Sequence, residues 1–158
     1  MTGPRVGLGF DVHAFDPGRP LRLGGVGFEG SAGLAGHSDG DAVCHAVADA
    51  LLGAAALGDL GEHFPDTDPA FAGIAGLELL GRAAGLAARA GLHPDSVDLT
   101  VIAERPSIAP ERDAMRSRLA EALGIPVARV SVKATRPEGL GLSGEGIGCL
   151  AIVVLTPS

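Results

Sequence analysis

The chain has 158 residues, a formal net charge of −7 and 46% apolar residues, with no Trp or Tyr and five Phe. At this length we expect one domain, residues 1–158, that buries roughly 70% of the surface exposed by the unfolded chain. Lys133 is the single lysine, and the lack of a basic run argues against a nucleic-acid partner. No apolar stretch of about 18 residues and no signal-peptide pattern occurs, so we expect no membrane segment and a cytoplasmic location.

The first elements predicted in chain order are strands. Val6, Leu8 and Phe10 alternate with glycines, a pattern that predicts a strand over 5–10. A second strand, weakened by glycine, is predicted over 22–28.

Helices follow. The Ala- and Leu-rich stretch 38–57 is predicted to be a helix with Ser38 as its N-cap and Gly58 just beyond its end. After a turn, apolar residues at helical spacing predict a second helix over about 70–90, ended by Gly91. The remaining predicted elements are a strand at 97–103, a helix at 110–123, a strand at 130–134 and a strand at 149–155.

Strands mixed with helices of these lengths predict an α/β (α+β) two-layer sandwich. The strand at 149–155 has no polar face. We therefore expect it to be covered on both sides, by helices or by another subunit.

Polar residues that can carry chemistry gather in two places. Asp11 and His13 are two positions apart after the first strand, so their side chains point to one side. Asp41, His45 and Asp49 are spaced four residues apart on one helix face. Two imidazoles and a carboxylate form a typical catalytic zinc site, and Asp41 or Asp49 is a candidate to fix the tautomer of His45. The alternative is that His45 is a hydrogen-bonded core residue and Asp11 a turn residue.

The stretch SDGDAVCHAVADALLGA at 38–54 is similar to the signature of the 2-C-methyl-D-erythritol 2,4-cyclodiphosphate synthase family. Further motifs that resemble this family follow the family's order. They are GFDVHAF at 9–15, GLAGHSDGD at 33–41, GDLGEHFPDTDP at 58–69, ERPSIAP at 104–110, VKAT at 132–135 and EGLGLSGEGIG at 138–148. The resemblance therefore spans nearly the whole chain.

The resemblance implies a fold and an activity. The fold would be a mixed β-sheet covered by helices on one face, in a homotrimer whose sheets pack around the central axis and whose active sites lie between subunits. The activity would be that of a lyase of the non-mevalonate isoprenoid pathway. In that reaction the 2-phosphate of 4-diphosphocytidyl-2-C-methyl-D-erythritol 2-phosphate attacks the β-phosphorus, which yields the cyclic diphosphate and CMP. An isoprenoid diphosphate in the axial cavity is a further partner that the resemblance suggests.

The resemblance also implies residue roles. Asp11, His13 and His45 would bind one zinc per subunit, and Glu138 would hold magnesium or manganese with the substrate diphosphate. The catalytic residues would be His37, Thr135 and Arg136. On the methylerythritol side, substrate-binding residues would be Asp11, His13, His37, Ser38, Asp59, Leu60, Gly61, Phe64, Pro65, Asp66, Thr67 and Asp68. On the cytidine and diphosphate side they would be Ala103, Glu104, Arg105, Pro106, Ser107, Ile108, Ala109, Thr135, Arg136, Pro137, Glu138 and Leu142.

Three departures from the family pattern affect these roles. Arg136 and Pro137 follow VKAT where the family usually has two threonines before the glutamate. Ser107 stands where the family usually has a lysine, and the segment 144–146 lacks an arginine that the family usually has. They keep open a non-catalytic trimer that binds a metal or an isoprenoid diphosphate on the same scaffold. A zinc phosphohydrolase is a third hypothesis, disfavoured because no extra base for water is evident.

Other charged residues are predicted to have ordinary surface roles. His63 lies in a polar turn, and Arg112, Arg116 and Arg118 are predicted to form the exposed face of a helix. Two roles are open for Lys133: a solvated lysine at the end of a strand, or a lysine that contacts a substrate phosphate.

Overall fold

The computed structural model describes residues 3–142 and 144–158. Its strands are β1 (Arg5–Leu23), β2 (Val26–Leu34), β3 (Leu92–Ile102), β4 (Val130–Thr135) and β5 (Gly146–Pro157). Its helices are α1 (Ala42–Ala54), α2 (Leu60–His63), α3 (Gly76–Arg89) and α4 (Arg112–Leu123), with short 3₁₀ turns at Pro69–Phe71, Ala109–Glu111 and Val127–Arg129. No helix among the described residues is both long and apolar enough to cross a membrane.

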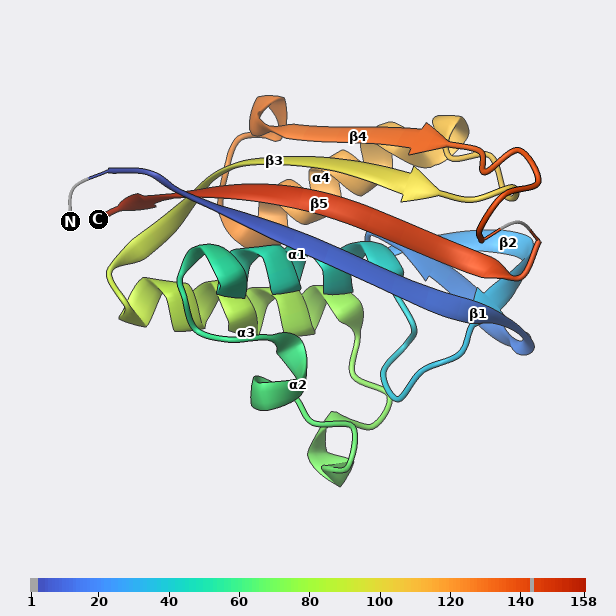
Figure 1. The fold of residues 1–158 in the computed structure, drawn as a ribbon, viewed down its shortest axis with the longest axis horizontal. Coiled ribbons are helices and arrows are strands. Elements are labelled where there is room, and N and C mark those ends of the chain that lie inside the picture. The colour runs from blue at the N-terminus through green and yellow to red at the C-terminus, as the bar shows by residue number, and fades with distance from the viewer. Residues whose placement is uncertain (1–2, 143) are drawn as a thin grey trace.

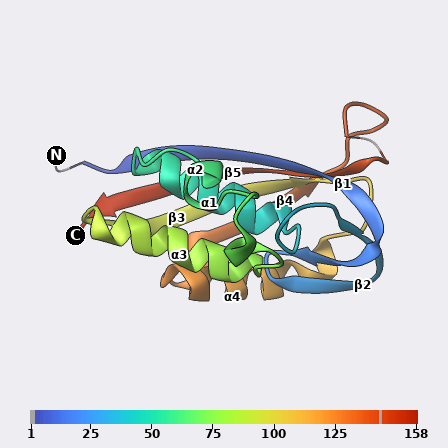
Figure 2. The same ribbon diagram turned by 90° about the horizontal axis from the view of Figure 1, so that it is seen from below.

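The described strands form one mixed sheet in the order β2-β1-β5-β3-β4. β3 and β4 are parallel, whereas the other neighbouring pairs are antiparallel. Helices α1, α3 and α4 lie on one side of this sheet (Figures 1 and 2). The prediction of a mixed α/β fold with helices layered on a sheet is thus confirmed.

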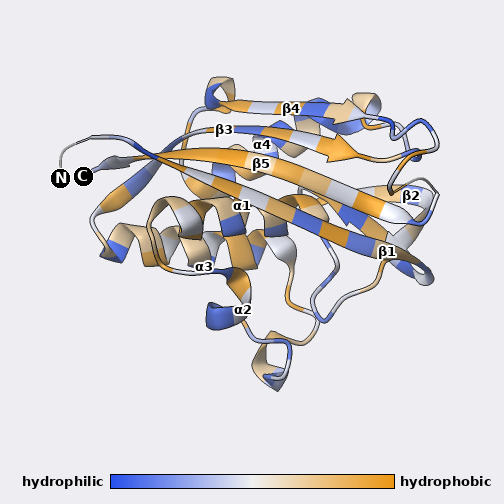
Figure 3. Ribbon diagram, viewed as in Figure 1, coloured by the Kyte–Doolittle hydropathy of each residue, from blue (hydrophilic) through white to orange (hydrophobic). Residues whose placement is uncertain are grey.

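The opposite face of the sheet carries exposed apolar side chains. Gly7 and Gly9 let β1 approach α1, because a Cβ at either position would overlap a backbone carbonyl oxygen of that helix. The alternating large residues therefore point away from α1. These residues, together with two from β5, are 40% to 67% exposed: Val6, Leu8, Phe10, Val12, Leu150 and Ile152. Figure 3 shows the hydrophobic bands along β5 and β1. Within the described residues, β5 is thus covered on one side only.

Helix α1 begins later than predicted. Its N-cap is Asp41, whose carboxylate accepts a hydrogen bond from the backbone N–H of Cys44, and Ser38 belongs to the preceding loop. Gly40 has φ 76°, which interrupts a helix that would start at Ser38. The buried Asp41 carboxylate also accepts from the N–H groups of Gly24 and Gly25 in the β1–β2 turn. One side chain thus fixes both the start of α1 and the hairpin.

The predicted starts of two other elements also needed correction. Strands β1 and β2 form one long hairpin, since Gly24 and Gly25 have φ 59° and 76° and allow a two-residue turn where the sequence suggested a continuing strand. Helix α3 begins at Gly76 because Gly73 has φ 69° and breaks the helical path. The N–H of Gly76 donates to the carboxylate of Asp39, which ties the start of α3 to the loop before α1.

Candidate metal centre and substrate cavity

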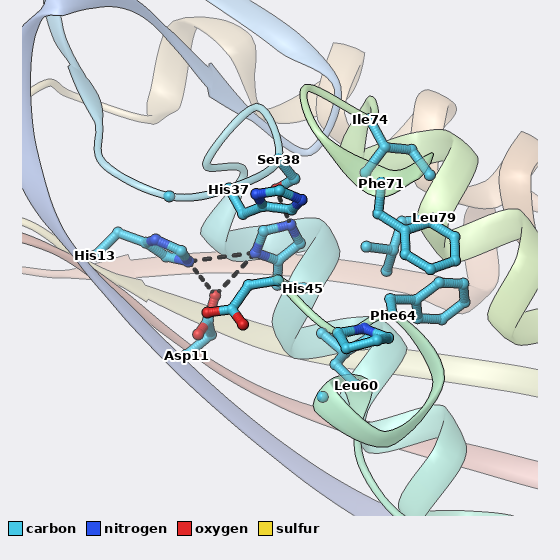
Figure 4. Close-up of a pocket in the computed structure, with 14 residues that line it drawn as sticks. Asp11, His13, His37, Ser38, His45, Leu60, Phe64, Phe71, Ile74 and Leu79 are labelled. Carbon is cyan, nitrogen blue, oxygen red and sulfur yellow. Dashed lines mark hydrogen bonds and ion pairs between the residues drawn. The ribbon is translucent and has the colours of Figure 1, made fainter. Parts of the chain in front are cut away.

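Three side chains from two distant segments meet between β1 and α1. Asp11 and His13 extend from β1, and His45 rises from the first turns of α1 (Figure 4). The Asp11 carboxylate oxygen Oδ2 lies 2.6 Å from His13 Nε2 and 3.2 Å from His45 Nδ1, and the two ring nitrogens are 3.2 Å apart. Ligand atoms bound to one tetrahedral zinc at about 2.0–2.1 Å would be about 3.3 Å apart. The three atoms are close to that spacing, so this set fits a metal ion.

Hydrogen bonds to the remaining ring nitrogens orient both imidazoles. His13 Nδ1 donates to the carbonyl oxygen of Ala35 at 2.5 Å, which leaves Nε2 as the nitrogen that faces Asp11 and that would bind a metal after losing its proton. His45 Nε2 lies 2.8 Å from the hydroxyl oxygen of the buried Ser38, and its Nδ1 faces the cluster. Ser38 and Ala35 thus occupy the outer positions that usually fix the tautomers of metal-binding histidines.

The two aspartates expected to orient His45 have other partners. Asp41 is the N-cap of α1, as described above. The Asp49 carboxylate accepts from the backbone N–H of Leu60 at 3.2 Å and positions α2 instead. The prediction for Asp41 and Asp49 is therefore wrong within the described residues, because the orienting group comes from the loop before the helix.

The members of the cluster shift one another's pKa. Burial alone would raise the pKa of Asp11, but hydrogen bonds from His13 and His45 outweigh it and the pKa is lowered. Burial alone would lower the pKa of His13, but the hydrogen bond and charge of Asp11 outweigh it and the pKa is raised. A cation at this position would compete with protons for the ring nitrogen of His13.

A cavity of about 460 Å³ opens from the cluster. Its far wall is apolar, with Phe64 and Phe71 in edge-to-face contact at 5.3 Å between ring centroids. Seven of the predicted methylerythritol-side residues line it in addition to the three ligands: His37, Ser38, Leu60, Gly61, Phe64, Pro65 and Asp66. The structure adds Gly36, Phe71, Ile74 and Leu79, which sequence reasoning missed.

Three predicted residues lie outside this cavity. Asp59 caps α2 and lines a smaller neighbouring hollow with Asp11 and His45. Asp68 caps the Pro69–Phe71 turn, and its carbonyl oxygen is 3.1 Å from His37 Nε2, which must donate to it. Thr67 is exposed. The turn that carries these residues thus orients His37 through the backbone.

A second hollow, of about 140 Å³, lies between the loop after β3 and the end of β4. Predicted residues that line it are Ala103, Pro106, Ser107, Ile108, Ala109, Thr135 and Arg136. Arg112 also lines it, and its Nε is buried without an acceptor among the described residues. This arginine was predicted to lie on an exposed helix face, and the prediction is wrong because the start of α4 faces the loop.

The other residues predicted on this side do not line the second hollow. Glu104 accepts from the N–H of Gly139, and the Arg105 guanidinium lies 4.7 Å from the ring centroid of Phe15. Pro137 is half-buried and Glu138 is exposed, with φ 56°. Leu142 is half-buried, and its side chain lies over Gly148. A Cβ at position 148 would come within 2.6 Å of the Leu142 side chain. Glu138 is outside the group of potential metal ligands found among the described residues.

Three of the charged surface residues have specific partners. Arg116 is half-buried and donates to the carbonyl oxygens of Val127 and Val130, so it fastens α4 to the start of β4. His63 Nε2 donates to the carbonyl oxygen of Leu57 at 2.7 Å. Lys133 forms an exposed ion pair with Asp98 on β3, which favours the strand-surface interpretation of this lysine.

A family model described as the YgbB family matches residues 4–156. The chain belongs to the YgbB family. A YgbB relative, the 2-C-methyl-D-erythritol 2,4-cyclodiphosphate synthase of Symbiobacterium thermophilum, is 53% identical over 152 residues, which cover 95% of this chain and 97% of that protein.

Solved structures agree with the YgbB assignment. The bifunctional IspDF of Campylobacter jejuni matches with a TM-score of 0.95 and 41% identity, over 100% of this chain and 43% of that chain. A structure of 2C-methyl-D-erythritol-2,4-cyclodiphosphate synthase in a CDP-bound form matches with a TM-score of 0.89 and 36% identity, over 96% of this chain and 99% of that chain.

Two of the departures noted in the sequence lie in one place. Ser107, at a position where the family resemblance led us to expect a lysine, and Arg136 both line the second hollow beside Arg112. Two arginines thus line the hollow in which the expected lysine is missing.

Proposed function

We propose that this chain is a 2-C-methyl-D-erythritol 2,4-cyclodiphosphate synthase that cyclises 4-diphosphocytidyl-2-C-methyl-D-erythritol 2-phosphate and releases CMP. The observation that carries the proposal is the Asp11, His13 and His45 cluster at the mouth of the cavity of about 460 Å³. A cavity of this size accommodates a small molecule. The sequence identity to synthases over nearly the whole chain supports the same activity.

The reaction needs no nucleophile from the protein. An oxygen of the substrate's 2-phosphate forms the new bond to the β-phosphorus, and the bond from that phosphorus to the oxygen bridging it to the α-phosphate breaks as CMP leaves. Burial raises the pKa of both thiols, Cys44 and Cys149, so neither suits nucleophilic chemistry. The protein's task is to hold the two phosphates in line and to neutralise their charge.

The cavity residues match that task. His37 is exposed at the cavity, and its Nε2–H is directed to the carbonyl oxygen of Asp68. We propose that this ring meets the reacting phosphates. The apolar wall of Phe64 and Phe71 suits the carbon skeleton of methylerythritol. Zinc is the metal proposed for Asp11, His13 and His45, one ion per subunit, and when bound it supplies positive charge and Lewis acidity to phosphate oxygens.

The substrate diphosphate carries more charge than one zinc ion neutralises. We propose that Glu138 holds a second divalent ion, magnesium or manganese, with the diphosphate. A net charge of −7 favours such recruitment of cations for binding a polyphosphate. Thr135, Arg136 and Arg112 would contact the nucleotide phosphates from the second hollow, where Arg112 Nε requires an acceptor.

The proposed assembly is a homotrimer. The exposed apolar row on β1 and β5 has no cover within the described chain, and such a patch is typical of a subunit interface. The cavity and the second hollow have no lining residue in common among the described residues. The first observation supports an assembly of subunits, and we propose that this assembly joins the cavity of one subunit to the second hollow of its neighbour. An isoprenoid diphosphate on the trimer axis and a cytoplasmic location stay predictions.

Product analysis tests the activity. The purified protein, loaded with zinc and magnesium, is expected to convert the diphosphocytidyl substrate into equal amounts of CMP and cyclic diphosphate. A hydrolase would give CMP with an uncyclised product, and a non-catalytic binder would give no CMP above a metal-chelated control. The non-catalytic alternative is not favoured, because the cluster and the cavity are intact.

A further inference from the structure

The loop from Ala35 to Ser38 connects three parts of the candidate site. Its Ala35 carbonyl oxygen orients His13, its His37 side chain faces the cavity, and its Ser38 hydroxyl orients His45. The position of this short loop therefore sets the geometry of both imidazole ligands and of the residue proposed to meet the phosphates.

Arg19 of β1 holds this loop from the side. Its Nη1 donates to the carbonyl oxygen of Gly36 at 2.8 Å, and its Nη2 donates to the carbonyl oxygen of Ser38. These two carbonyls flank His37. Among the described residues, neither carbonyl has another donor, whereas the intervening His37 carbonyl accepts from the backbone N–H of Gly73.

The sequence around Arg19 explains how it reaches the loop. The pairing of β1 with β2 shifts register on both sides of Pro20, so the strand is irregular where Arg19 leaves it. On β2, a Cβ at Gly33 would lie 2.6 Å from the carbonyl oxygen of Pro20, and only glycine allows this close approach. The half-buried Arg19 side chain is thus directed across the hairpin onto the loop.

We infer that Arg19 is a positioning residue for the proposed cyclisation, acting by clamping the Gly36 and Ser38 peptide carbonyls so that His37 and the ring of His45 stay aligned. The inference rests on the proposed function for its kinetic part, but the loop geometry does not depend on it. A planar guanidinium suits the role because two of its nitrogens can donate to two separate acceptors at once. A lysine has one ammonium nitrogen on a flexible stem and cannot hold both carbonyls in the same fixed geometry.

Arg19→Met tests the clamp, with Arg22→Met as the matched control. Arg22 lies on the same strand, is exposed and makes no hydrogen bond among the described residues. Hydrogen–deuterium exchange of the metal-free protein is expected to rise at residues 35–40 in Arg19→Met and to stay unchanged in Arg22→Met. In the zinc-loaded enzyme, Arg19→Met is expected to lower kcat about 10- to 100-fold, with a smaller change in KM, because misplacement of reacting groups mainly affects the chemical step.

Arg19→Lys covers the case in which Arg19→Met does not fold. It should retain the fold and lose part of the clamp, with a kcat between those of the parent protein and Arg19→Met. Unchanged exchange at 35–40 together with parental kcat in either Arg19 variant would overturn the inference. Equal losses in the Arg19 and Arg22 variants would overturn it too. A parent protein that forms no cyclic product would refute the proposed function, and the exchange data would still decide whether Arg19 holds the loop.

Discussion

Replacing Ser38 by alanine is expected to weaken zinc binding without removing any ligand. The Ser38 hydroxyl is 6% exposed and lies 2.8 Å from His45 Nε2, and it also accepts from the N–H of Gly40 at 3.3 Å. The substitution leaves the ring N–H of His45 without its acceptor in a buried place. Loss of such an outer partner typically lowers metal affinity about 10- to 100-fold, which corresponds to about 1.4–2.8 kcal/mol.

Competition with a chromogenic zinc chelator measures this effect, and Ser117→Ala on the exposed side of α4 is the control. We expect Ser38→Ala to lose zinc affinity by that factor, to retain one zinc per subunit at saturation, and to keep the melting temperature within a few degrees of the parent. A parental zinc affinity in Ser38→Ala would refute the reasoning that the Ser38 hydroxyl fixes the ring of His45.

Four further predictions follow from individual contacts. Leu8→Glu places a charge on the exposed apolar row and should convert the proposed trimer into monomers in sedimentation analysis. A trimer that persists in this variant would contradict the proposed interface. Gly9→Ala should lower the free energy of unfolding, measured in urea, by more than about 2 kcal/mol, because the new Cβ would overlap the Ala46 carbonyl oxygen. The control is Gly81→Ala on α3, whose new Cβ would meet open space and which should be neutral or stabilising. Arg112→Met should raise KM more than it lowers kcat, since its buried Nε faces the second hollow; an unchanged KM would remove it from the nucleotide site. Finally, zinc competes with protons for His13, whose pKa is raised above 6.5. Zinc affinity should therefore fall as the pH decreases, beginning above pH 6.5. A zinc affinity that stays constant down to pH 6 would contradict this.

Two of the proposed metal ligands were accessible to sequence reasoning because their spacing is local. Asp11 and His13 are two positions apart on a strand, and a period of two puts them on one side. The meeting of this pair with His45 spans more than 30 residues, and only the family resemblance indicated it. The contact itself follows from Gly7 and Gly9, which let β1 lie directly on α1.

The residues that orient the ligands could not be read from spacing. Asp41 and Asp49 satisfy helical periodicity with His45, but Asp41 is outside the helix as its N-cap and Asp49 faces α2. Ser38 reaches His45 because Gly40 reverses the chain between them. A residue with positive φ changes the direction of the chain, so helical periodicity cannot predict where the side chains before it point.

Arg19 and Arg112 show a similar limit. Both are arginines without a motif around them, and their roles depend on which backbone carbonyl or hollow lies across from them. For Arg112, the pattern of α4 suggested solvent, because helical periodicity says nothing about the loop that precedes the helix. Long-range packing, which sets these neighbours, had to come from the structure.

The most direct test of the account is the product balance of the parent protein and of His45→Ala under the same conditions. The account predicts that the zinc-loaded parent forms CMP and cyclic diphosphate in equal amounts, and that His45→Ala loses bound zinc and turnover together while its fold and assembly match those of the parent. CMP formation with an uncyclised product, or full turnover by a His45→Ala variant that lacks zinc, would contradict the central claim.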